Sequence, residues 1–172
     1  MCEGVLVSVT KIVLLVKIQA KPFDLNVIQV YAPTGDHTED EVEEFYEDLN
    51  KARKMCKSQE VVMVIGDLNA KVGKGVESQV VGPYGLGERN DRGERWVEWC
   101  RENRFMIANT WFCNHPRRLG TWKSPGDLVR NQIDYIRVVH GSGRPTGRVG
   151  LGRVGSRFLL IAMGRVGSGQ KF

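Results

Sequence analysis

The sequence predicts one α/β domain that is followed by a disordered basic tail. Apolar runs of strand length alternate with helical patterns as far as residue 139. Such interleaving of strands and helices is typical of α/β proteins. From residue 140 onward this pattern stops, and glycine and arginine dominate the sequence. We therefore predict a domain over residues 1–139 and a tail over residues 140–172.

Several runs rich in valine and isoleucine predict the strands of the domain. Residues 12–18 and 24–31 combine β-branched residues with partial alternation. Residues 61–65 form a near-continuous apolar run, which is typical of a strand that is covered on both faces. Further strand candidates are residues 105–108, 121–122 and 133–138.

Two segments carry the start signals of helices. Thr38 is followed three residues later by Glu41, the spacing of a capping box, and acidic residues fill the first turn. The helix that follows presents one apolar stripe, formed by Val42, Phe45, Leu49, Ala52 and Cys56. A second helix is predicted to begin near Asn90 or Asp91, after a glycine-rich loop over residues 73–90. Its inward side chains are expected to be Trp96, Val97 and Cys100.

The net charge of +5 belongs to the tail and not to the domain. The chain has 172 residues, 41% of them apolar and 26% charged, which excludes wholesale disorder. A basic protein suggests a nucleic-acid partner. However, residues 1–139 hold 19 basic and all 20 acidic side chains, whereas residues 140–172 hold six basic side chains and no acidic one.

The tail has two competing interpretations. Gly-Arg-Val-Gly occurs at residues 147–150, 152–155 and 164–167, and nine of the 20 glycines lie in the tail. This composition predicts disorder. The arginines could bind nucleic acid non-specifically through its phosphates. Alternatively, the segment is unrelated to the domain, and its repetition favours this second interpretation.

Cysteine spacing and the amino-terminal apolar run bear on the compartment. The four cysteines are far apart and show no CxxC pair, which argues against a zinc site or a disulfide scaffold. We interpret them as free thiols of an intracellular protein, nuclear or cytoplasmic and not secreted. Residues 12–16 are too few to cross a membrane and are bracketed by Lys11 and Lys17, so a buried strand is predicted there.

Gly66-Asp67-Leu68-Asn69 is the first candidate for a functional site. It follows the apolar run 61–65 directly, where α/β sheets usually place their ligand sites. Asp67 could orient or deprotonate a water molecule, and Asn69 could donate to a phosphoryl oxygen. The same residue types also form ordinary turns. On its own, the tetrapeptide favours the turn.

Tyr31 and Asp134 are the next candidates, and each has an alternative interpretation. Tyr31 ends a predicted strand, where its hydroxyl could contact an anion or its ring could simply pack. Asp134 lies in an otherwise apolar strand, where an unpaired carboxylate is costly. A histidine or metal partner would account for Asp134, and so would outward alternation along the strand.

The order of these motifs resembles a known superfamily. Residues 31–34 (Tyr-Ala-Pro-Thr), 66–69, 121–122 (Thr-Trp) and 133–135 (Ile-Asp-Tyr) occur in the order of the endonuclease/exonuclease/phosphatase superfamily. The longer segments 27–34, 66–73, 85–94 and 130–136 look like the RTE-type endonucleases of LINE retrotransposons and the domesticated craniofacial development protein 2. The resemblance runs from about Gly4 to Ile136.

The resemblance implies a fold, a cofactor and a set of residue roles. The family fold is a two-sheet α/β sandwich of the DNase I type, of which this chain would form a part. Its members hold a divalent metal, usually magnesium, and cleave phosphodiester bonds, so DNA is the implied partner. By this resemblance Asp67 positions or activates the attacking water, and Asn69 and Tyr31 contact the scissile phosphate. Asp134 would hold the catalytic histidine in orientation.

Three further residues are implied to bind substrate, and two expected parts are missing. Thr34, Thr121 and Trp122 match substrate-contacting positions, although many relatives carry Asn where Thr34 stands. The metal-binding Glu of the family lies upstream of the segment that matches Gly4, and its Ser-Asp-His motif does not occur in this sequence. His140 is too close to Asp134 to replace that histidine.

These absences lead to two functional hypotheses. The first is an endonuclease-like domain, incomplete at both ends, that is inactive or impaired because the metal-binding Glu and the catalytic His are absent. The second is a non-catalytic nucleic-acid-binding or interaction module. The sequence gives no prediction of the oligomeric state.

Overall fold

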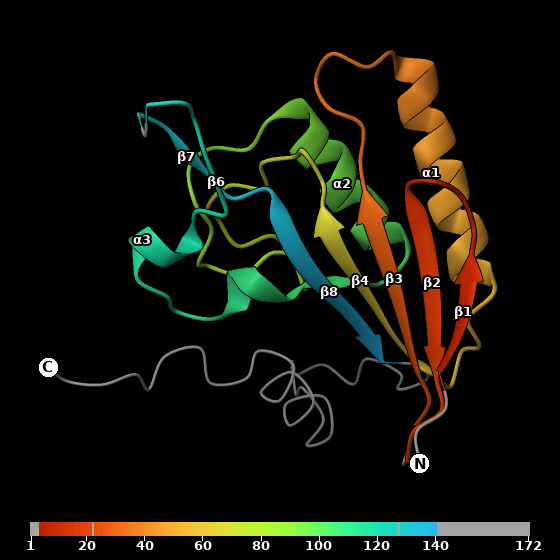
Figure 1. The fold of residues 1–172 in the computed structure, drawn as a ribbon. Coiled ribbons are helices and arrows are strands. Elements are labelled where there is room, and N and C mark those ends of the chain that lie inside the picture. The colour runs from red at the N-terminus through yellow and green to blue at the C-terminus, as the bar shows by residue number, and fades with distance from the viewer. Residues whose placement is uncertain (1–3, 22, 127, 141–172) are drawn as a thin grey trace, which may run out of the picture. The chain divides into compact units, whose positions relative to one another are not determined.

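A six-stranded mixed sheet forms the body of the molecule (Figure 1). The computed structural model describes residues 4–21, 23–126 and 128–140; apart from His140, the predicted tail lies outside these residues. The strand order in the sheet is β1-β2-β3-β4-β8-β5. The strands are β1 (Gly4–Ser8), β2 (Val13–Ile18), β3 (Leu25–Tyr31), β4 (Val61–Asp67), β5 (Met106–Ile107) and β8 (Asp134–His140), while β6 (Trp122–Lys123) and β7 (Arg130–Asn131) form a separate two-stranded sheet.

The pairing directions place the ends of three central strands together. β3 and β4 are parallel, and β8 runs antiparallel to β4. The carboxyl ends of β3 and β4 therefore meet the amino end of β8 at one edge of the sheet. The predicted α/β class is confirmed, as are the main predicted strands; β1 and β7 were not predicted.

The helices are α1 (Glu39–Lys54), α2 (Asp91–Glu102), the short α3 (Pro116–Leu119) and the 3-10 turn η1 (Ala108–Trp111). The capping box predicted at the start of α1 is confirmed, since the Thr38 hydroxyl accepts from the Glu41 amide at 3.3 Å and the Glu41 carboxylate accepts from the Thr38 amide at 2.8 Å. Asn90 caps α2 through the Gly93 amide. No helix among the described residues is long and apolar enough to cross a membrane.

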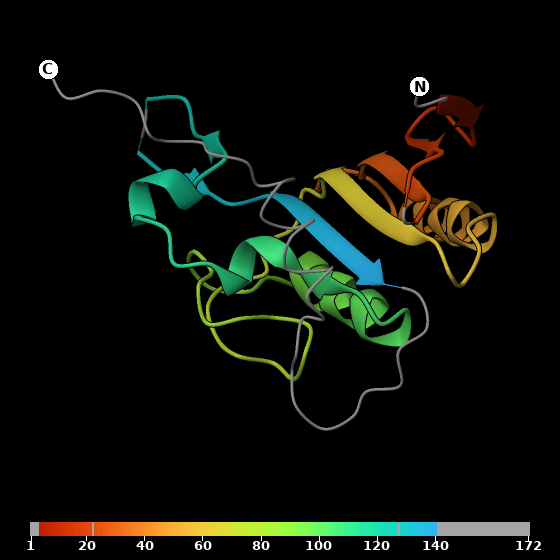
Figure 2. The same ribbon diagram turned by 90° about the horizontal axis from the view of Figure 1, so that it is seen from below.

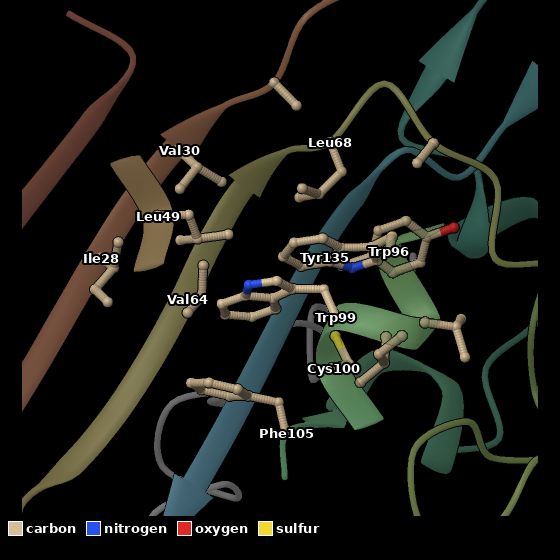
Figure 3. Packing of buried hydrophobic residues seen from close by; sticks show 14 of the residues in the cluster. Ile28, Val30, Leu49, Val64, Leu68, Trp96, Trp99, Cys100, Phe105 and Tyr135 are labelled. Atoms are coloured by element: carbon tan, nitrogen blue, oxygen red, sulfur yellow. The ribbon is translucent and has the colours of Figure 1, made fainter. Parts of the chain in front are cut away.

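The hydrophobic core lies between the sheet and the two long helices, which share one side of the sheet (Figures 1 and 2). Its centre is a run of stacked rings, with centroids 5.1 Å apart for Trp96 and Trp99 and 5.2 Å apart for Trp99 and Phe105 (Figure 3). The predicted inward residues Trp96, Val97 and Cys100 are all buried. Ile28, Val30 and Val64 from the sheet and Leu49 from α1 complete this region.

No helix among the described residues covers the other face of the sheet (Figure 2). In β4, Val62 and Val64 point toward the helices and are buried, whereas Met63 and Ile65 are only half-buried on the opposite face. The prediction that this strand is covered on both faces is therefore wrong for the described residues. A short apolar run cannot distinguish the two cases, because half-buried aliphatic side chains still shield one another across a sheet.

Candidate functional site

Three of the predicted site residues lie side by side on three adjacent strands. The Cα register pairs Tyr31 of β3 with Asp67 of β4, and Asp67 with Asp134 of β8. Register partners point to the same face of a sheet. Their chain neighbours Val30 and Tyr135 are buried under the helices. Tyr31, Asp67 and Asp134, here called the polar row, thus lie on the helix-free face.

Local geometry at the ends of β3 and β4 explains why the row forms there. The Ala32 amide donates to the Asp67 carbonyl at 2.9 Å, which continues the parallel ladder one residue past Tyr31. Gly66 has a φ of 138°, and a Cβ at this position would stand 1.9 Å from the Val30 carbonyl oxygen. Only glycine allows β4 to approach β3 so closely just before Asp67. Tyr31 is left 56% exposed.

Asn69 is tied to both neighbouring strands. Its amide donates to Asp67 Oδ1 at 2.8 Å, and its side-chain Nδ2 donates to the Ala32 carbonyl at 2.7 Å. A φ of 46° places Asn69 in the left-handed region, which asparagine tolerates better than most residues. The segment is therefore a tight turn, as one interpretation of the motif predicted. The same turn fixes the side-chain amide of Asn69 beside the polar row.

Side chains from two distant segments fix the backbone at Asp134. Thr121 Oγ1 accepts hydrogen bonds from the amides of Ile133 and Asp134, at 3.1 and 3.2 Å. Asn109 donates from Nδ2 to the Asp134 carbonyl at 3.3 Å, and its Oδ1 accepts from the Ile136 amide at 2.7 Å. Asn109 was not predicted, because nothing in its local sequence indicates a long-range partner. Asp134 opens β8 and does not lie inside the strand as predicted.

Burial and a neighbouring carboxylate act on Asp67 of the polar row. Partial burial raises the pKa of Asp67 above its ordinary value, the Asn69 amide opposes this rise, and the charge of Asp134 adds to it. A cation near the pair would relieve both the burial cost and the repulsion. The side chains of Asp67 and Asp134 thus suit a positively charged ligand.

The donor set accommodates a magnesium ion only in part. Within residues 4–21, 23–126 and 128–140, no three His, Cys, Asp or Glu side chains are grouped as metal ligands. Magnesium, however, is commonly held by one or two carboxylates together with water and substrate phosphates. Asp67 and Asp134 fit that mode, in which the substrate completes the coordination.

The three residues predicted to bind substrate do not all lie at the polar row. Thr34 lies beyond β3, where its amide and hydroxyl both bond to His37 Nδ1, at 3.2 and 2.9 Å. Thr121 contacts the backbone at Asp134, as described above. Trp122 is 42% exposed on β6, next to Thr121. The structure therefore brings Thr121 to the polar row, while Thr34 is bonded to His37; substrate binding by Thr34, Thr121 and Trp122 stays a prediction.

Most of the chain is similar in sequence to curated proteins of one kind. Over 121 residues it is 49% identical to craniofacial development protein 2 of Bos taurus, and over 120 residues 48% identical to that of Tragulus javanicus. Each match covers 70% of this chain, but only 20% and 21% of those proteins. The chain thus spans about a fifth of the length of these relatives. No family model matches the sequence.

Solved structures share the fold of most of the chain. The endonuclease domain of TRAS1, a telomere-specific non-LTR retrotransposon, superposes with a TM-score of 0.56 at 14% identity, over 79% of this chain and 53% of that one. The chain has the endonuclease/exonuclease/phosphatase fold. D. rerio TDP2 complexed with single-strand DNA product shares this fold, with a TM-score of 0.50 at 12% identity over 83% of this chain and 54% of its own.

The predicted resemblance to craniofacial development protein 2 is therefore confirmed by sequence, and the predicted fold of the endonuclease/exonuclease/phosphatase superfamily is confirmed by the superpositions. The chain covers about half of each of these superposed structures. Its sheet has helices on one face and half-buried apolar side chains on the other. This arrangement agrees with the predicted partial sandwich of the DNase I type.

Proposed function

We propose that the polar row is a phosphodiester-binding site, and that the chain is an endonuclease-like domain of retrotransposon origin whose partner is DNA. The observation that carries this proposal is the alignment of Tyr31, Asp67 and Asp134 in one register row, beside the fixed amide of Asn69. The likeness to a retrotransposon endonuclease domain and to a DNA-bound protein of the same fold supports it.

Each residue of the site has a chemically suitable task. Tyr31 is exposed, and its hydroxyl would donate a hydrogen bond to a phosphate oxygen. Asn69 would contact the same phosphate. Asp67 would orient the attacking water and accept its proton as the new bond to phosphorus forms. Phosphoryl transfer depends on such positioning and on charge stabilisation more than on covalent chemistry.

Magnesium is the cofactor that this proposal implies. Asp67 and Asp134 are the residues that would hold it, as their adjacent carboxylates favour a cation. When bound, the ion would stabilise negative charge on the phosphoryl oxygens.

We further propose that hydrolysis by this chain is impaired. When the bond to the leaving oxygen breaks, that oxygen needs a proton, and a histidine oriented by Asp134 would be its source. Among the described residues, His37 bonds to Thr34 and His115 caps α3. His140 pairs with Val61 at the opposite end of β8 from Asp134. Loss of general acid catalysis typically lowers a rate by about 10²–10⁴-fold.

Nicking of supercoiled plasmid DNA in magnesium tests this proposal. We expect a rate near background for the full chain and for Asp67→Ala and Asn69→Ala. Robust nicking that either substitution abolishes would confirm the site and overturn the impairment. DNA affinity, measured in the same samples, tests the alternative function of a binding module without catalysis: that module requires affinity that depends on the polar row and persists when no nicking occurs.

A further inference from the structure

Next to the polar row, the helix-free face of the sheet is apolar over three register rows. The middle row crosses all six strands and consists of Leu6, Val16, Val27, Met63, Val138 and Met106. The row between it and the polar row consists of Leu14, Gln29, Ile65 and Ile136. The row on its other side contains Ile18, Leu25 and Val61. We call these three rows the apolar face.

The apolar face keeps much of its surface accessible. Apart from Leu6, Gln29 and Val61, its side chains are half-buried, although each is flanked by neighbours in the same sheet. Leu6 is 66% exposed. On the helix side, by contrast, the row formed by Leu15, Ile28 and Val64 is 0% exposed. The helices thus bury one side of the sheet completely, and the described residues leave the other side partly open.

The size of the apolar face suits a specific interface. Strands about 4.8 Å apart and rows about 7 Å apart give six strands and three rows an area of roughly 500–600 Å². A contiguous apolar patch of a few hundred Å² or more commonly marks an interaction site. Two such faces in contact would bury roughly 1,000–1,200 Å² in total, which reaches the lower end of specific protein–protein interfaces.

We propose that the apolar face packs against the same face of a second copy of this chain. A twisted sheet fits another sheet of the same twist, at a separation of about 10 Å and with the strands within about 30° of each other. A single helix, about 10 Å wide, would cover only about two of the six strands. Gln29 is the one polar member of the three rows, which suits the high apolar content of homodimer interfaces.

Charge does not oppose this association. Residues 1–139 hold 19 basic and 20 acidic side chains, a net charge of −1, so two copies of the domain repel each other only weakly. The apolar face itself carries no ionisable side chain in its three rows. Closed two-fold dimers are also the commonest homo-oligomers.

The polar row determines the orientation of the two copies. A two-fold axis parallel to the strands would bring the Asp67 and Asp134 carboxylates of both copies together at one end, where they would repel one another. An axis along the middle row places the two polar rows at opposite ends. The rows of Gln29 and Leu25 then face each other, and each polar row lies past the last apolar row of the partner. Both polar rows thus stay outside the apolar interface, which does not depend on the phosphodiester site.

Sedimentation velocity of the full chain between about 1 and 100 μM measures the association. We expect a reversible dimer with a Kd of about 10 μM, since the interface is small. Met63→Lys, on a central strand, should raise Kd at least thirtyfold, because it would bury an unpaired ammonium group near the axis. The Kd should change less than twofold in NaCl between about 50 and 500 mM, because apolar burial is not screened by salt.

Leu6 and Val5 offer a matched pair that does not threaten the fold. They are neighbours in β1, 66% and 57% exposed, and their side chains point to opposite faces of the sheet. Leu6→Lys should raise Kd about three- to tenfold and Val5→Lys less than twofold. Circular dichroism verifies that each variant is folded, and this pair decides the test if Met63→Lys does not fold.

A monomer at every concentration would overturn the proposal. Equal weakening by Leu6→Lys and Val5→Lys would show an effect of added charge or of the β1 edge and would overturn the role of the apolar face. Higher oligomers without a discrete dimer would overturn the two-fold arrangement, and dissociation by salt would show an ionic association instead. Tyr31→Phe should dimerise like the parent chain, so a failure of the phosphodiester site remains distinguishable from a failure of the dimer.

Discussion

Arg137 lies fully buried, with its guanidinium carbon 3.7 Å from the centre of the Trp96 ring. Its Nη2 donates to the Tyr135 carbonyl at 3.3 Å, while Nε and Nη1 have no hydrogen-bond partner among the described residues. Burial lowers the pKa of Arg137 to about 10. β8 and α2 are thus joined by a stacked cation and not by a salt bridge.

The first prediction concerns this buried cation. Arg137→Met keeps the bulk and removes the desolvated charge, so the free energy of unfolding should stay within about 1 kcal/mol of the parent value or rise. Arg137→Ala should lose about 3 kcal/mol, because it leaves a cavity beneath Trp96. Urea unfolding followed by circular dichroism measures both. A loss above about 2 kcal/mol for Arg137→Met would show that the cation itself is needed.

Gly66→Ala should be among the most damaging single-methyl changes in the chain. The new Cβ would overlap the Val30 carbonyl, and the positive φ would be strained as well. We expect a loss of more than about 3 kcal/mol or failure to fold. Gly35→Ala is the control, since nothing lies within 4 Å of its Cβ position. Similar urea midpoints for the two variants would contradict the close approach of β3 and β4.

Asp67→Asn should stabilise the protein at neutral pH and not at acidic pH. Because the folded pKa of Asp67 is raised, the native state binds more protons than the unfolded state at pH values between the unfolded pKa, about 4, and the folded pKa. Stability therefore falls as the pH rises through the folded pKa, and the substitution removes this loss. The group is partly screened by solvent, so we expect a Tm increase of only about 1–2 °C at pH 7 in EDTA.

That gain should shrink at pH 3.5, where the parent carboxyl is mostly protonated in both states. Thermal unfolding at the two pH values provides the measurement, and Asp36→Asn in an exposed loop is the control. A gain of equal size at both pH values would contradict the electrostatic explanation.

The same substitution should change DNA affinity in opposite directions with and without magnesium. In EDTA, Asp67→Asn removes a negative charge that repels phosphate, so affinity should increase about two- to fivefold. In magnesium, the same change removes a ligand of the ion, and affinity should decrease. Anisotropy of a labelled oligonucleotide at constant ionic strength gives both values. An identical change in the two buffers would exclude a metal-dependent role of Asp67.

Tyr31→Phe isolates the hydroxyl of the polar row. Because Tyr31 is exposed, the free energy of unfolding should change by less than about 0.5 kcal/mol. Loss of a hydrogen bond to a phosphate oxygen should lower DNA affinity roughly three- to tenfold. Tyr84→Phe, which alters another exposed tyrosine, is the matched control. Equal affinities of Tyr31→Phe and the parent chain would remove Tyr31 from the site.

The sequence predicted those features of the fold that depend on residues close together in the chain. The capping box at Thr38 and the start of α2 depend on contacts within one turn, so sequence sufficed for them. β1 could not be predicted, because the strand is defined by its pairing with β2. The hydrogen bond from Asn109 to the Asp134 carbonyl joins residues that are 25 positions apart, and no local sequence pattern indicates it. The members of the polar row were named through family resemblance, since spacing alone does not reveal which strands pair.

The polar row is complete only when two strand pairs are in register, β3 with β4 and β4 with β8. A shift of β3 by a single residue against β4 would turn Tyr31 into the core beside the helices and leave Asp67 facing Val30. Such a shift would leave only Asp67 and Asp134 aligned, so the complete row requires native register on both sides of β4. Under the proposed function, phosphate affinity would therefore report native strand alignment, and it would distinguish a correctly folded chain from a misfolded one even where no hydrolysis is measured.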